Sequence, residues 1–153
     1  MYRPAIGRPR VLLVVSHPSV GAGIETILRL ERRYDLRRAA KLTEAVDLAR
    51  AWPADLALVD ALLIRGGARP DFGVPTLILA GGPADAATAE RSIDTSRGWV
   101  AKDAPSADLV SAVERLLTEP AQASAGSFAL FAIGVLVVVL AGLLVYLVWI
   151  AVA

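Results

Sequence analysis

The last 26 residues of the chain, from Phe128 to Ala153, form an apolar run that constrains the chain more than any other stretch. The run contains no charged residue and no Asn, Gln, Ser, Thr or Pro, and 17 of its residues are Leu, Ile, Val or Phe. As a helix it would extend about 39 Å, which exceeds the roughly 30 Å of a bilayer's hydrocarbon core. A buried helix of a soluble domain would keep a polar face or a shorter apolar run. We therefore predict that residues 128–153 form a single helix that spans a lipid bilayer.

The rest of the chain divides into three parts. Residues 1–8 are a short tail, residues 9–118 make one domain of ordinary size, and residues 119–127 are a linker of small residues. The first residues carry arginines but no apolar core before a cleavage site, so they do not form a signal peptide. We expect a tail-anchored, single-pass protein of the cell membrane whose domain lies in the cytoplasm. The positive-inside rule adds almost nothing, because no Lys or Arg lies close to either end of the apolar run.

The composition excludes several classes of site. The chain has no cysteine and one histidine, so disulfides, thiolate chemistry and Cys- or His-rich metal sites are not expected. The net charge is +1, and the excess of basic residues lies in the first half of the chain, at Arg29, Arg32, Arg33, Arg37, Arg38 and Lys41. A chain pI near 8.2 and the lack of a reading helix argue against nucleic-acid binding. This basic cluster could rest on anionic lipid, but a solvated face beside Glu31 and Asp35 is the favoured interpretation.

Apolar runs and helical patterns alternate along the domain. Strands are predicted over residues 10–15, 36–40, 56–60, 76–80 and 99–101; the first is expected to be buried on both faces, and the second is weaker. Helices are predicted over residues 18–32, 43–52, 84–95 and 106–118. Helix caps are expected at Ser16 or Ser19, at Thr43 and at Ser106. Residues 61–75 contain a glycine pair and prolines and have room for little more than a helical turn. The alternation predicts an α/β fold with an open five-stranded parallel sheet and helices on both faces.

Three stretches of this pattern carry a resemblance to a known family. They are RVLLVVSHPSVGAGI at residues 10–24, ADLALVDALL at residues 54–63 and GWVAKDAPSADLVSAVERLL at residues 98–117. Together they resemble the receiver domains of response regulators, a flavodoxin-like fold, and in particular the receivers of LuxR-type regulators. The resemblance covers roughly residues 9–118 and implies a role in two-component or phosphorelay signal transduction.

The resemblance places two residues on the family's phosphorylation site. Asp60 falls on the phospho-acceptor, and Lys102 falls on the lysine that contacts the phosphoryl group. Both follow predicted parallel strands, and ligands of open α/β sheets bind at the carboxyl ends of such strands. A carboxylate nucleophile approached by an anion also needs a neighbouring cation to neutralise charge.

The chain departs from the family at the other positions of that site. The acidic pair that holds Mg²⁺ in the family falls on Val15 and Ser16, and the hydroxyl-bearing switch residue falls on Ala80. Trp99 stands where the family has its switch aromatic residue. Because Mg²⁺ prefers an octahedral shell of oxygens that includes carboxylates, Asp60 alone predicts a poor metal site, and no cofactor is expected. The receiver is therefore predicted to be degenerate.

Four smaller motifs have structural interpretations that we prefer to functional ones. His17 matches a histidine of the family and is expected to be structural, and Gly21 and Gly23 do not complete a dinucleotide-binding fingerprint, because position 26 is Thr. Gly81 and Gly82 suit a turn better than an anion-binding nest. In the apolar run, three small residues share one helical face: Gly134, Ala141 and Gly142. Such a face could let two membrane helices pack closely, so a homodimer remains a possible arrangement.

The sequence favours a membrane-tethered, non-enzymatic receiver that works by protein–protein contact, with a signalling protein such as a sensor kinase as its partner. The contacts are expected on the last helix of the domain and on the face of the helix before it. One alternative is a functional receiver that is phosphorylated on Asp60, and a further alternative is a small-ligand sensor that uses the same crevice.

Overall fold

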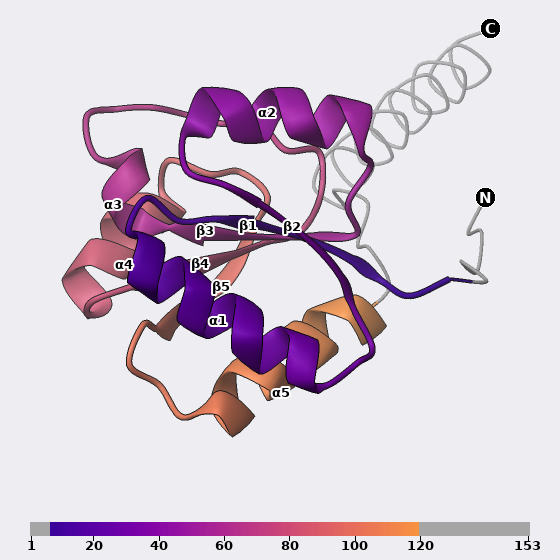
Figure 1. Cartoon of the computed structure of the whole chain (residues 1–153). Helices are drawn as coiled ribbons and strands as arrows, with labels where there is room; N and C mark the ends of the chain where they lie inside the picture. Colours follow the sequence, from indigo (N-terminus) through magenta and orange to yellow (C-terminus); the bar gives the residue numbers. More distant parts are fainter. Residues whose placement is uncertain (1–6, 120–153) are drawn as a thin grey trace, which may run out of the picture. The chain divides into compact units, whose positions relative to one another are not determined.

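The computed structural model describes residues 7–119. These residues form a five-stranded parallel sheet in the order β2-β1-β3-β4-β5 (Figure 1). The strands are β1 (Arg10–Val14), β2 (Asp35–Ala39), β3 (Leu56–Asp60), β4 (Thr76–Ala80) and β5 (Ser96–Ala101). The helices are α1 (Pro18–Leu30), α2 (Leu42–Ala51), α3 (Ala61–Ile64), α4 (Pro83–Glu90) and α5 (Ser106–Thr118). The predicted α/β class and strand number are confirmed.

The three inner strands are apolar except for Arg10, Asp60 and Thr76 at their ends, because helices cover both faces of the sheet. Alternate residues of β1, β3 and β4 join two separate core clusters. Leu28 of α1 and Val113 of α5 are fully buried in one cluster, and Ala45 of α2 and Ala86 of α4 are fully buried in the other. In Figure 1, α2 accordingly lies on the opposite side of the strands from α1 and α5. Both clusters lie within the described residues, which form one compact unit with a core of its own.

Most predicted elements are present, with differences at their ends. Strands β3 and β4 have the predicted bounds, and α3 is the single turn for which residues 61–75 had room. Positive φ angles at Gly66 and Gly67 carry the chain away from α3 directly after Arg65, a conformation that glycine adopts without steric cost. Helix α4 ends at Glu90 rather than near residue 95, and β5 begins at Ser96, three residues earlier than predicted.

The predicted helix caps are wrong. His17, Lys41 and Pro105 occupy the N-cap positions of α1, α2 and α5, and none of them makes a side-chain capping hydrogen bond. At α2, the Glu44 carboxylate instead accepts a hydrogen bond from the Ala40 N–H at 3.2 Å. Prolines at the entries of α1 and α5 set the extended backbone that a hydroxyl cap would otherwise stabilise, so the serine signals were misleading.

The predicted membrane helix over residues 128–153, with the small residues Gly134, Ala141 and Gly142, lies outside the described residues. So do nearly all of the predicted tail (residues 1–8) and linker (residues 119–127). Among residues 7–119, no helix is both long enough and apolar enough to cross a bilayer.

Candidate functional site

Asp60 and Lys102 meet at the carboxyl edge of the sheet. Asp60 is the last residue of β3, and Lys102 directly follows β5, where its N–H donates to the Ala80 carbonyl of β4 at 3.0 Å. The Lys102 Nζ lies 2.6 Å from the Asp60 Oδ1. The Asp60 side chain is 1% exposed and that of Lys102 is 20% exposed. The structure therefore brings together the two residues that the sequence assigned to one site.

The Asp60 carboxylate is already engaged by the protein. Its Oδ1 also accepts a hydrogen bond from the Leu62 N–H at 2.9 Å, so Asp60 is the N-cap of α3. Its Oδ2 is buried and has no hydrogen-bond donor among the described residues. One oxygen thus holds both the lysine and the start of α3, and the other is enclosed.

The neighbours of this carboxylate do not form a magnesium site. Val15, where the family has an acid, is 2% exposed and belongs to the apolar cluster under α1 and α5. Ser16 is exposed, and Ala80 is fully buried and has no hydroxyl. Across residues 7–119 there is no group of three or more His, Asp or Glu side chains placed to hold a metal. Because Mg²⁺ needs several oxygen ligands in octahedral geometry, the residues present at Asp60 do not fit this ion.

The remaining positions singled out in the sequence have structural surroundings. Trp99 lies in β5 opposite Ile78 of β4 and is 38% exposed. The His17 Nδ1 is 2.9 Å from the Ser19 Oγ at the exposed start of α1. Gly82, at the N-cap of α4, has an extended backbone (φ −175°) and not the curled conformation of an anion-binding nest.

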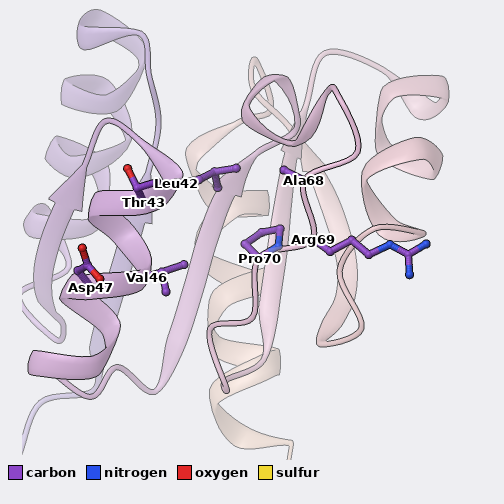
Figure 2. A pocket seen from close by; sticks show the side chains of 7 residues that line it. All are labelled: Leu42, Thr43, Val46, Asp47, Ala68, Arg69 and Pro70. Atoms are coloured by element: carbon purple, nitrogen blue, oxygen red, sulfur yellow. The ribbon is translucent and has the colours of Figure 1, made fainter.

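An apolar hollow lies away from these residues. A cavity of about 380 Å³ separates α2 from the loop after α3, and its lining is drawn in Figure 2: Leu42, Thr43, Val46, Asp47, Ala68, Arg69 and Pro70. In this view the Leu42 and Val46 side chains point from α2 towards the loop, whereas the Arg69 side chain points away. Neither Asp60 nor Lys102 lines this hollow.

Sequence reasoning missed two arrangements. The capping contact from Asp60 to the Leu62 N–H had a signal, because Asp is a favoured N-cap directly before a helix. The second is the position of Arg10 and Arg37 over the ring of Trp52, with guanidinium carbons 5.8 Å and 5.2 Å from the ring centre. No sequence pattern could predict this contact, because Arg10 lies in β1, Arg37 lies in β2 and Trp52 directly follows α2.

Comparison with known proteins supports the fold. No family model matches the chain, and no curated protein matches its sequence. Among solved structures, the chain is similar to the signal receiver domain of a Mycobacterium tuberculosis protein assigned as the response regulator NarL. That match has a TM-score of 0.62 and 23% identity, and it covers 74% of this chain and 99% of that one.

Two further solved structures agree. A LuxR-family two-component response regulator from Aurantimonas sp. SI85-9A1 matches with a TM-score of 0.60 and 28% identity, over 71% of this chain and 84% of that one. A CheY-like receiver domain protein from Methanospirillum hungatei JF-1 matches with a TM-score of 0.55 and 18% identity, over 72% and 94%. The described residues therefore have the flavodoxin-like fold of response-regulator receiver domains.

Proposed function

We propose that this chain is a degenerate receiver that acts in signal transduction by protein–protein contact and not by phosphoryl transfer. The observation that carries the proposal is the state of Asp60. Its Oδ1 is held by Lys102 and by the N–H of Leu62, and its Oδ2 is enclosed. A phosphoryl donor would have to reach this buried oxygen without a second carboxylate to hold a metal and without a hydroxyl at Ala80 to receive the phosphoryl oxygens.

The proposal includes a tether. The apolar run over residues 128–153 would anchor the domain at the cytoplasmic face of the cell membrane. Tethering would raise the effective concentration of the domain near membrane partners, such as sensor kinases.

The partner surface that we propose is the edge of the domain formed by α4, β5 and α5. Both helices contact β5, so the three elements form a continuous surface. Strand β5 is an edge strand and carries Trp99, whose side chain is partly exposed. Aromatic side chains are enriched at protein–protein interfaces, so Trp99 suits a contact surface. The first turn of α5 is exposed at Ser106, Ala107 and Asp108.

Site-specific photo-crosslinking in cells tests this proposal. A photoreactive residue would be placed in the full chain at Ala87 of α4 or Ser111 of α5, which are both exposed, and at Asp47 of α2 as a control on another surface. We expect crosslinks to a membrane signalling protein from the first two positions only, and the same crosslinks in an Asp60→Asn background. Crosslinks that disappear in Asp60→Asn, or that form only at Asp47, would contradict the proposal.

A phospho-acceptor function is the second candidate. The observation in its favour is the ion pair of 2.6 Å between Lys102 and Asp60 at the carboxyl ends of parallel strands. The test is the intact mass of the full chain in detergent after incubation with Mg²⁺ and a small phosphodonor. A gain of one phosphoryl group that is absent from Asp60→Asn would establish this function and refute the non-catalytic one.

A further inference from the structure

The structure divides the basic residues of the amino-terminal half into two groups. Members of the first group have carboxylate partners. Arg29 lies 2.7 Å from Glu25, Arg33 lies 2.7 Å from Glu114, and Arg38 lies 3.8 Å from Glu25. For these three arginines, ion pairing on the surface accounts for their charge, although their partners are Glu25 and Glu114 and not the expected neighbours Glu31 and Asp35.

Members of the second group have no such partner: Arg8, Arg10, Arg32, Arg37 and Lys41. Within residues 7–119, no Asp or Glu oxygen lies within 4.0 Å of their side-chain nitrogens. All 15 Asp and Glu residues of the chain lie between positions 25 and 119, so no side-chain carboxylate remains outside the described part to pair with them. Three members of this group, Arg8, Arg10 and Arg37, belong to β1, to β2 or to the residues just before β1. No ion pair neutralises their side chains, and the nearby Asp55 carboxylate accepts a hydrogen bond from the backbone N–H of Arg10 at 2.8 Å.

Two of these arginines converge. Arg10 begins β1, and Arg37 lies in the middle of β2 opposite Leu12, so the two arginines are close neighbours across the paired strands. Both guanidinium groups lie over Trp52, at 5.8 Å and 5.2 Å from the ring centre. The ring attracts each cation but cannot cancel the repulsion between them. An anion that contacted both guanidinium groups would cancel it.

A polar cavity borders one member of this pair, Arg10, whereas Arg37 and Trp52 are not part of its lining. It has a volume of about 380 Å³, and its lining is Gly7, Arg8, Arg10, Tyr34 and Asp35. It lies where β1 and β2 begin, at the edge of the sheet opposite the carboxyl edge that carries Asp60. The cavity therefore belongs to neither the Asp60 site nor the apolar hollow beside α2.

We propose that Arg8 and Arg10, which line this cavity, bind a phosphate-bearing anion at the amino-terminal edge of the sheet, and that Arg37, beside Arg10 over Trp52, adds a third positive charge. Planar guanidinium groups match the oxygens of phosphate in paired hydrogen bonds, and three of them suit an anion with more than one negative charge. The Asp35 carboxylate in the lining opposes the anion and should weaken its binding. The phosphate could belong to a soluble polyphosphate or to the headgroup of an anionic lipid. This proposal does not depend on the role of Asp60.

Trp52 provides the readout. In the full chain held in neutral detergent micelles, Trp99→Phe and Trp149→Phe leave Trp52 as the only tryptophan. Pyrophosphate at low ionic strength should change the Trp52 emission saturably, because the anion draws the guanidinium groups from the ring. We expect Arg37→Gln and Arg10→Gln each to weaken binding about tenfold, as the loss of one charge-assisted hydrogen-bond partner does. Asp35→Asn should tighten binding several-fold, and added salt should weaken it.

Arg29→Gln is the matched control, because Arg29 is also an exposed arginine of this half but already has a carboxylate partner. It should leave the affinity within about twofold of that of the parent chain, since it removes only a screened, distant charge. Saturation by pyrophosphate in neutral micelles would support a soluble phosphate ligand. A response only when the micelles contain phosphatidylglycerol would support a lipid headgroup. No response to either, or equal weakening by Arg29→Gln and Arg37→Gln, would overturn the proposal.

Discussion

Removal of the Lys102 charge should destabilise the domain strongly, because it would leave the Asp60 carboxylate buried and uncompensated. At the observed 2.6 Å, the attraction between the two charges is about 6 kcal/mol for an effective dielectric constant of about 20. Part of this attraction is offset in Lys102→Met, because the cost of desolvating the ammonium group is also removed. Breaking a fully buried pair costs about 3–5 kcal/mol of stability. Since the Lys102 side chain is one-fifth exposed, we expect Lys102→Met to lower the free energy of unfolding by a little less, about 2–4 kcal/mol.

Urea unfolding of residues 1–119, followed by circular dichroism, measures this loss, because both core clusters lie within that part of the chain. The double variant Asp60→Asn/Lys102→Met should recover to within about 1 kcal/mol of the wild type, since no buried charge remains and Asn can still accept from the N–H of Leu62. The exposed pair of Arg33 and Glu114 is the control, and Arg33→Met should cost about 0–1 kcal/mol. If Lys102→Met costs no more than Arg33→Met, the reasoning about a buried pair is wrong.

Three further predictions concern single residues. Gly98 has φ +121°, which side chains rarely adopt, so Gly98→Ala should lower the free energy of unfolding by about 1–3 kcal/mol in the same urea assay. A Cβ at Gly23 meets open space, so Gly23→Ala should add about 0.5–1 kcal/mol of stability; Gly21→Ala should add less, because its Cβ would lie 3.2 Å from an arginine side chain. A destabilised Gly23→Ala variant would contradict the α1 geometry. Burial and the neighbouring Glu114 raise the pKa of the Tyr34 hydroxyl above 10.0. The contribution of this hydroxyl to stability should therefore be complete below about pH 10 and should decrease as the pH rises through the native pKa. When the free energy of unfolding is measured between about pH 9 and pH 12, Tyr34→Phe should remove the part of its decrease with pH that comes from this group.

The inner strands could be predicted from the sequence because burial on both faces leaves a continuous apolar run. Strand β5 was predicted less well, because Arg97 and Gly98 interrupt its apolar pattern and its start depends on pairing with β4 across a register shift. Helix α4 was predicted too long, because residues 91–95 contain no glycine or proline to mark its end, whereas the burial of Ile93 fixes a turn there.

The two sites differ in the same way: one could be expected from the sequence, and the other depends on tertiary contacts. The pairing of Asp60 with Lys102 was implied by the resemblance to receiver domains, and it was supported by the position of both residues at carboxyl ends of parallel strands. The convergence of Arg10 and Arg37 on Trp52 depends on the register between β1 and β2 and on where α2 ends. No local pattern encodes such a contact, and only the assembled domain reveals it.

The intact mass of the full chain, after incubation with Mg²⁺ and a small phosphodonor, tests the central claim most directly. A variant that restores the family's oxygen ligands, Val15→Asp/Ser16→Asp/Ala80→Thr, provides the matched comparison on the same fold. We predict that the wild-type chain gains no phosphoryl group and that the restored variant gains one at Asp60. A phosphoryl adduct on the wild-type chain that is absent from Asp60→Asn would contradict the account.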